Sequence, residues 1–157
     1  MDFNDSPEEA KFRKEVNDWL SINATPKGKS KDSATLSEED ALKIAKSWQT
    51  KLYDNGWACL HWPKEYGGRG STPIERVIWG QEASNYKLPA GFFEIGQGMA
   101  GPVLMMYANE EQKKKYLPPM AKGEEIWCQL FSEPGAGSDL AGLKTKSVLD
   151  GDMWTIN

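Results

Sequence analysis

Histidine and cysteine are scarce in this sequence. Among its 157 residues there is one histidine, His61, and there are two cysteines, Cys59 and Cys128, which stand far apart and form no CxxC pair. A zinc centre needs a cluster of such ligands, and a Ser-His-Asp arrangement needs a histidine beside its nucleophile. The sequence supports neither kind of site. We therefore expect no metal, and we interpret both cysteines as buried free thiols.

Long apolar runs and blocks of basic residues are also missing. No stretch approaches the roughly 18 apolar residues of a membrane span, and the N-terminus is acidic and amphipathic, unlike a signal peptide. Nineteen basic and 23 acidic residues give a formal charge of −4, and the one basic cluster, residues 113–115, falls within a helical pattern. These features disfavour nucleic-acid binding and predict a soluble, cytoplasmic protein with no membrane span.

Helix signals are present at four places in the first 122 residues. Ser6-Pro7 and Thr72-Pro73 each combine an N-cap with a first-turn proline, and a glutamate follows where a capping box needs it. Ser37 and Asn109 are N-caps of two further helices. Apolar stripes at helical spacing follow three of these caps: Phe12, Val16, Trp19 and Leu20; Ala41, Ile44, Ala45, Trp48 and Leu52; and Ile74, Val77, Ile78 and Gln81.

The segments between these helices are predicted to be irregular. Residues 21–35 are polar and read as a loop, whereas residues 57–66 are rich in aromatic rings that we expect to pack in the core. Residues 91–101 are apolar and glycine-rich, and we expect a flexible entry into a helix opened by Pro102. The third helix is predicted to end near Tyr86, and Pro118-Pro119 is predicted to break the last one.

After Gly123 the pattern becomes strand-like. Residues 126–131 predict a buried strand, and residues 144–149 and 153–156, joined by a tight turn at Asp150-Gly151, predict a hairpin. Two or three strands cannot complete an independent sheet core, so we expect a truncated protein. The predicted fold is mainly α, with a helical bundle over residues 1–123 and the first strands of an antiparallel β-domain over residues 124–157.

The first of two glycine clusters matches a dinucleotide fingerprint. Residues 96–101 read G-Q-G-M-A-G, which is G-x-G-x-x-G letter for letter. A true fingerprint follows a strand, opens a helix and precedes an acidic residue at the end of the next strand. Here a helical region precedes the glycines, and Pro102 follows them directly. Glu133 lies farther along the chain than the acidic residue of a true fingerprint. A nicotinamide-binding Rossmann domain is therefore disfavoured.

The second cluster, Gly135-Ala136-Gly137-Ser138, follows Pro134 and lies between Ser132 and the rest of the chain. Small residues leave backbone amides uncovered, and such a turn can direct several N–H groups at one anion. A phosphate group is a plausible ligand. By itself, however, the cluster is equally compatible with an ordinary turn between two strands.

The residues around this turn resemble the signature of the acyl-CoA dehydrogenases, flavoenzymes that oxidise the Cα–Cβ bond of acyl-CoA thioesters. The matching residues are Gln129, Phe131, Ser132, Glu133, Pro134, Gly135, Ala136, Gly137, Ser138 and Asp139. Residues 56–68, 98–102 and 110–118 are similar to family segments in the same order. Four ordered matches are far more specific than one motif. The resemblance implies a truncated acyl-CoA dehydrogenase fold, with an all-helical N-terminal domain over residues 1–123 and the beginning of the middle β-domain over residues 124–157.

The resemblance also implies an FAD site. The Ser132 hydroxyl would approach flavin N5, where a hydrogen bond stabilises the negative charge that arrives with hydride. Gly137 and Ser138 would contact the FAD pyrophosphate, and Ser138 would also lie near the CoA part of the substrate. Met99 and Val103 would face the acyl chain. The implied FAD-binding residues are Gln129, Leu130, Phe131, Ser132, Gly137 and Ser138.

The base that removes the α-proton in this family is usually a glutamate of the C-terminal helical domain, so we expect no catalytic residue in this chain. We expect Glu133 and Asp139 to orient the turn. Two functions follow. The resemblance implies either the N-terminal portion of an FAD-dependent acyl-CoA dehydrogenase that would pass electrons to an electron-transfer flavoprotein, or a non-catalytic subunit or interaction module of a heteromeric acyl-CoA dehydrogenase. A homo- or hetero-oligomer is expected.

Overall fold

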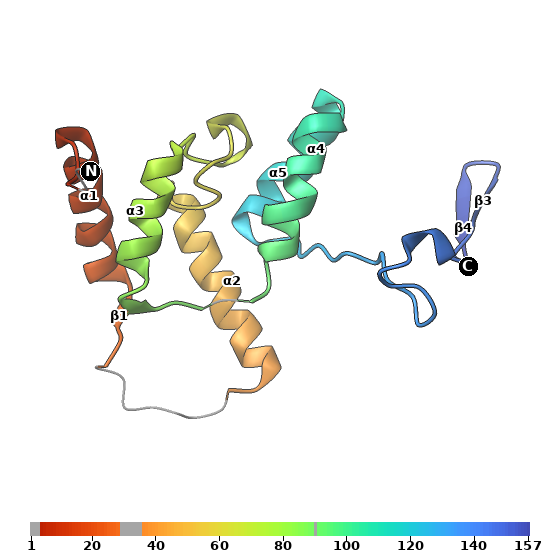
Figure 1. The fold of residues 1–157 in the computed structure, drawn as a ribbon, viewed down its shortest axis with the longest axis horizontal. Helices are drawn as coiled ribbons and strands as arrows, with labels where there is room; N and C mark the ends of the chain where they lie inside the picture. Colours follow the sequence, from red (N-terminus) through yellow and green to blue (C-terminus); the bar gives the residue numbers. More distant parts are fainter. Residues whose placement is uncertain (1–3, 29–35, 90) are drawn as a thin grey trace. The chain divides into compact units, whose positions relative to one another are not determined.

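The computed structural model describes residues 4–28, 36–89 and 91–157 (Figure 1). Within these ranges the fold is mainly helical with two small antiparallel sheets, which confirms the predicted fold class. The chain divides into two compact units, Met1–Trp127 and Cys128–Asn157. The elements of the first unit are α1 (Pro7–Asn23), β1 (Thr25–Pro26), α2 (Glu38–Asp54), the 3-10 helix η1 (Lys64–Tyr66), α3 (Pro73–Ala83), β2 (Tyr86–Lys87), the π-helix η2 (Gly96–Ala100), α4 (Gly101–Tyr107) and α5 (Glu110–Lys122).

Helices α1, α2, α3 and α5 begin where the sequence predicts. The Ser6 hydroxyl accepts the amide of Glu9 (3.2 Å), and the Glu9 carboxylate accepts the amide of Ser6 (2.7 Å). The same reciprocal box forms at Thr72 and at Asn109, and Ser37 caps α2. These side chains satisfy amides that have no partner inside the helix.

The connections differ from the prediction in two places. The predicted loop begins only after Asn23, and residues 29–35 of it lie outside the described residues. Helix α3 ends at Ala83 rather than near Tyr86, because Tyr86 and Lys87 pair with Pro26 and Thr25 in the short antiparallel sheet β1–β2. Each of these strands has two residues, too few for a sequence pattern to reveal.

One core cluster lies between α1 and α3, which run side by side (Figure 1). Trp57 stacks on Trp79 with ring centroids 5.0 Å apart, and the guanidinium of Arg69 lies 4.1 Å from the Trp57 ring. The predicted apolar stripe of α1 is confirmed. The stripes predicted for α2 and α3 include too many residues, because some of their apolar side chains are exposed. The buried members of this cluster are Phe12, Val16, Leu20, Trp57, Leu60 and Ile78. The exposed residues of the predicted stripes include Ile44, Ile74 and Val77.

A second core cluster forms around α5, which continues to Lys122 through both prolines. The predicted break at Pro118-Pro119 is therefore wrong. Each proline removes one amide donor from the helix, but Leu117, Met120 and Ala121 on the same turn are completely buried. The buried amide of Gln49 donates to the Ala121 carbonyl (2.7 Å), so the end of the helix is also capped from α2.

The glycine segment before α4 is helical and packed, which corrects the expectation of a flexible entry. Residues 94–107 are helical without interruption, and Gly96 and Gly101 are buried. A Cβ at Gly101 would overlap the indole of Trp62, which is fully buried. The Trp62 indole also donates to the Gln97 carbonyl (3.2 Å). Gly101 therefore serves close helix packing.

The second unit contains the 3-10 helix η3 (Leu140–Gly142) and the hairpin of β3 (Ser147–Asp150) and β4 (Met153–Ile156). The predicted hairpin is confirmed, with its turn at Gly151-Asp152, one residue later than expected. The strand predicted for residues 126–131 is wrong, because these residues pair with no strand in the described chain and are mostly exposed. Cys128 is exposed as well, which contradicts the expectation that both thiols are buried.

Candidate functional site

The glycine turn of the second unit is closed by its own main chain. The amide of Glu133 donates to the Ala136 carbonyl (2.8 Å), and the amide of Ala136 donates to the Glu133 carbonyl (3.1 Å). Pro134 and Gly135 form the tip between them, and Gly137 and Ser138 follow in a bend. Ala136 is 3% exposed, whereas the side chains around it are mostly exposed. The arrangement is a fixed turn with an open outer face.

The protein itself does not require glycine at Gly135 or Gly137. A Cβ added at either residue meets nothing within 4 Å, and neither residue has a positive φ. In the part of the chain that the structure describes, the amides of Gly137 and Ser138 donate to no protein acceptor. Uncovered amides beside residues without bulk are the chemistry of an anion site. The geometry therefore fits a phosphate group approaching from outside.

The four predicted flavin-ring residues precede this turn in an extended run. All four side chains are exposed, with Leu130 at 85% and Phe131 at 61%. A cavity of about 280 Å³ lies beside Phe131 and extends toward η3. Its lining adds Leu140 and Leu143, which the sequence interpretation missed because isolated leucines after a turn carry no distinctive signal. The lining residues are Leu130, Phe131, Glu133, Leu140, Leu143 and Thr145.

These features together suit a ligand with a flat ring and a phosphate. Nine consecutive residues of the second unit hold the Ser132 hydroxyl, the apolar side chains of Leu130 and Phe131, and the amides of Gly137 and Ser138. An apolar surface can cover a ring, and the amides can bind a pyrophosphate. The residues present therefore fit the FAD that the sequence resemblance implies.

The predicted substrate residues Met99 and Val103 belong to the first unit. They lie one helical turn apart on η2 and α4, with 45% and 57% of their surface exposed. Met106 and Tyr107 are also exposed and extend the apolar surface along α4. An apolar residue at this spacing in an ordinary core would be covered, so these side chains are available to a ligand or a partner.

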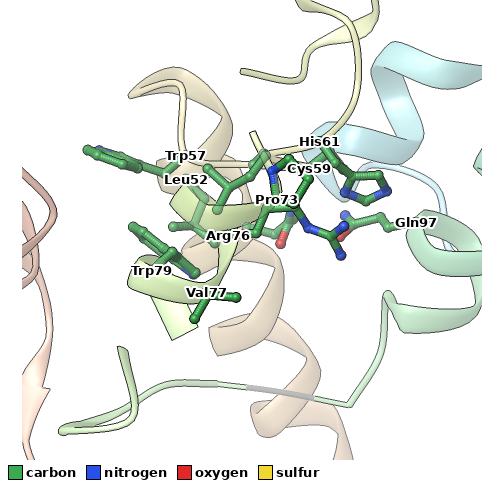
Figure 2. Close-up of a pocket in the computed structure, with 12 residues that line it drawn as sticks. Leu52, Trp57, Cys59, His61, Pro73, Arg76, Val77, Trp79 and Gln97 are labelled. Atoms are coloured by element: carbon green, nitrogen blue, oxygen red, sulfur yellow. The ribbon is translucent and has the colours of Figure 1, made fainter. Parts of the chain in front are cut away.

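The first unit also holds an open cavity of about 660 Å³ between α2, the aromatic connection and the start of α3 (Figure 2). Figure 2 shows the side chains of Arg76, His61 and Gln97 gathered at one end, with Trp57 and Trp79 at the other. The lining residues are Gln49, Leu52, Trp57, Ala58, Cys59, Leu60, His61, Pro73, Arg76, Val77, Trp79 and Gln97, and none of them is acidic.

Burial shifts the pKa values of two titratable groups of this cavity. Burial raises the pKa of the Cys59 thiol to about 12, so the thiol is protonated at neutral pH. Burial lowers the pKa of His61, and the neighbouring charge of Arg76 lowers it further. The cavity therefore offers apolar walls and a cation rather than a carboxylate base.

The described ranges contain neither a cluster of metal ligands nor a membrane-spanning helix. Among these residues, no three or more His, Cys, Asp or Glu side chains gather as metal ligands would. No helix within the same ranges is both long and apolar enough to cross a membrane.

Comparison with known proteins assigns the chain to a family. Residues 6–124 match the model of the acyl-CoA dehydrogenase N-terminal domain. The chain belongs to the acyl-CoA dehydrogenase family. Acyl-CoA dehydrogenase IpdE1 of Mycobacterium tuberculosis is 37% identical over 151 residues, which cover 93% of this chain and 38% of that relative. The family consists of oxidoreductases, and the predicted family resemblance is confirmed.

Solved structures of acyl-CoA dehydrogenases share the fold. The ChsE4–ChsE5 complex of Mycobacterium tuberculosis superimposes with a TM-score of 0.74 and 31% identity, covering 100% of this chain and 38% of that chain. An acyl-CoA dehydrogenase of Bacillus anthracis complexed with FAD gives a TM-score of 0.62 and 27% identity, covering 98% of this chain and 26% of that one. The chain thus spans well under half the length of these relatives, and its likeness to them confirms the predicted acyl-CoA dehydrogenase fold.

Proposed function

We propose that this chain is the N-terminal portion of an FAD-dependent acyl-CoA dehydrogenase, which carries out α,β-dehydrogenation of an acyl-CoA thioester with hydride transfer to flavin N5. The observation that carries the proposal is the turn at residues 133–138. Its glycines are not required by the fold, and its amides at Gly137 and Ser138 are uncovered. Family membership and the FAD complex of the Bacillus anthracis relative support the choice of ligand.

Each residue of the turn has a proposed role. The amides of Gly137 and Ser138 and the Ser138 hydroxyl bind the pyrophosphate of FAD, and Ser138 also faces the CoA part of the substrate. Leu130 and Phe131, with Gln129, border the ring and exclude water from it. The Ser132 hydroxyl donates a hydrogen bond toward N5 and stabilises charge there. FAD, when bound, supplies the hydride acceptor that no protein side chain provides.

The remaining parts of the reaction are assigned by the same proposal. Met99 and Val103 form a wall for the acyl chain, and a carboxylate outside this chain removes the α-proton.

Residues 1–123 are the N-terminal helical domain and residues 124–157 begin the middle β-domain. The end of α5 at Lys122, capped by Gly123, and the family match over residues 6–124 support this division. We place the complete enzyme in the cytoplasm and expect it to reduce an electron-transfer flavoprotein.

A second function is a non-catalytic subunit or interaction module of a heteromeric acyl-CoA dehydrogenase. The exposed apolar surface of Met99, Val103, Met106 and Tyr107 favours it, since such a surface can bind a partner chain. The ChsE4–ChsE5 relative is itself a complex of two chains. In this case Met106→Ser and Tyr107→Ser would weaken assembly and leave FAD affinity unchanged.

Titration of the purified chain with FAD, followed by flavin fluorescence, tests the first function. We expect saturable binding that weakens by about five- to twentyfold in Ser132→Ala and in Ser138→Ala, because each variant loses one polar contact. Ser147→Ala is the matched control, since Ser147 is an exposed serine of the same unit, in β3. Absence of binding by the folded chain, or equal affinities in all three variants, would contradict the assignment.

A further inference from the structure

The carboxylate of Glu133 joins two parts of the second unit that lie apart in the sequence. Its Oε2 accepts a hydrogen bond from the main-chain amide of Lys144 (2.9 Å), and its Oε1 accepts one from the amide of Thr145 (2.8 Å). Each carboxylate oxygen therefore accepts a hydrogen bond from one of two consecutive amides. Hydrogen bonds to an ionised acceptor are among the stronger ones in proteins. The Glu133 side chain is half-buried, although most of its neighbours in sequence are exposed.

The main chain of Glu133 closes the glycine turn at the same time. Its amide and its carbonyl both bond to Ala136, at 2.8 and 3.1 Å. The amides that its side chain holds lead directly into the hairpin β3–β4. One residue thus shapes the turn with its main chain and fastens the turn to the base of the hairpin with its side chain.

The loop that this contact closes has few other restraints. Residues 134–143 include three glycines, which have little conformational preference of their own. The hydrogen bonds inside the loop, from Gly142 to Asp139 and from Leu143 to Leu140, stay within η3 and its flanks. Among the described residues of this unit, no other hydrogen bond connects the loop to the hairpin.

We propose that Glu133 is a positioning residue, whose carboxylate keeps Gly137 and Ser138 in a fixed place next to residues 129–132. The inference rests on the proposed flavin site, because that site uses both sets of residues at once. Glu133 does not touch the flavin in this scheme. It acts through the loop, by holding the pyrophosphate-binding amides and the ring-binding segment in one arrangement before the ligand arrives.

The charge of Glu133 gives this role a pH dependence. The hydrogen bonds from Thr145 and Lys144 hold the pKa of Glu133 below its ordinary value near 4.5. Because the pKa is lower in the folded state, the contact supports the loop fully above about pH 4.5, and this support is lost as the pH falls further, through the lowered pKa. Asp139 and Lys144 are the other charged residues of segment 134–145. Glutamine at this position keeps the size but removes the charge and one acceptor oxygen.

Amide hydrogen exchange of the full chain, measured by NMR without FAD, tests the proposal with Glu133→Gln. We expect the Lys144 and Thr145 amides to exchange at least about tenfold faster, since each loses a charge-assisted hydrogen bond. The resonances of Gly137 and Ser138 should shift as the loop loosens. Asp152→Asn is the matched control, because it removes an exposed carboxylate from the hairpin turn of the same unit. It should change neither quantity.

Two further readouts separate the possible outcomes. The amides of Lys146 and Asn157, which bond to each other's carbonyls (2.8 and 2.9 Å), report whether the hairpin survives in the variant. In the wild-type chain, acid should shift the Gly137 resonance through the titration of Glu133, and Glu133→Gln should remove that contribution. Two results would overturn the proposal. One is unchanged exchange of the Lys144 and Thr145 amides in a variant whose hairpin is intact. The other is a wild-type Gly137 resonance that does not shift as the pH falls. Lack of FAD binding by wild type would instead count against the proposed function.

Discussion

Gly101→Ala is expected to lower the free energy of unfolding of this chain by about 2–4 kcal/mol, the cost of inserting a methyl group into a packed site that cannot yield. The added Cβ would overlap the indole of Trp62, with Cη2 only 2.6 Å and Cε2 3.1 Å away. The indole cannot move aside easily, because it is fully buried and donates to the Gln97 carbonyl. The gain in helix propensity, about 1 kcal/mol, is smaller than this cost.

Gly98→Ala is the matched control for this substitution. Gly98 lies in the same continuous helix, but a Cβ there meets nothing within 4 Å. We expect Gly98→Ala to leave the stability unchanged or to raise it by up to about 1 kcal/mol. Urea unfolding followed by far-ultraviolet circular dichroism measures both variants. Equal midpoints for Gly98→Ala and Gly101→Ala would show that close packing on Trp62 does not explain the glycine at position 101.

Gly137→Ala is expected to weaken FAD binding by at least about thirtyfold, because a methyl group would stand where the pyrophosphate approaches the main chain. The same change should leave the free energy of unfolding within about 0.5 kcal/mol of wild type. The reason is that the Cβ at Gly137 meets no protein atom within 4 Å, and the residue needs no positive φ. We therefore expect the substitution to change the affinity for FAD and not the stability of the fold.

Parallel FAD titration and urea unfolding measure the two effects of Gly137→Ala, with Gly98→Ala again as the control for adding one methyl group. Gly98→Ala should bind FAD as wild type does. If Gly137→Ala binds FAD normally, the turn does not approach the cofactor closely. If it unfolds the chain instead, the glycine has a structural purpose that the geometry at position 137 does not reveal.

Much of the fold could be predicted because its signals are local. The capping boxes at Ser6 and Thr72 are decided by residues three positions apart, and the hairpin by Gly151 between two strand-like segments. A long helix with one apolar face, such as α1, is specified in the same way. These features depend little on what the rest of the chain does.

The wrong predictions concern segments whose structure depends on contacts with residues distant in the sequence. Pro118 and Pro119 remain helical because the same turn buries Leu117 and Met120, and Gln49 caps its end from another helix. The residues before Ser132 look like a buried strand, but a strand also needs a pairing partner, and none is present in the described chain. Gly96 and Gly101 look flexible in the sequence, but in the structure Gly96 packs against Met120 and Gly101 against Trp62.

The candidate site, too, could be predicted only in part from the sequence. The motif from Gln129 to Asp139 identifies the turn from sequence, because its letters are distinctive. The openness of the amides at Gly137 and Ser138 and the two hydrogen bonds that Glu133 accepts depend on three-dimensional geometry. The cavity beside Phe131 also needed the structure, since Leu140 and Leu143 join it only after η3 has formed.

Mapping the amide chemical shifts of the chain during an FAD titration tests the flavin assignment most directly. The proposed place is the glycine turn, and the cavity of the first unit shown in Figure 2 is an alternative among the described residues. We predict the largest changes at Gly137 and Ser138, smaller ones across residues 129–132, and none at His61 or Arg76. Changes centred on His61 and Arg76, or none at the turn when FAD is saturating, would contradict the proposed site.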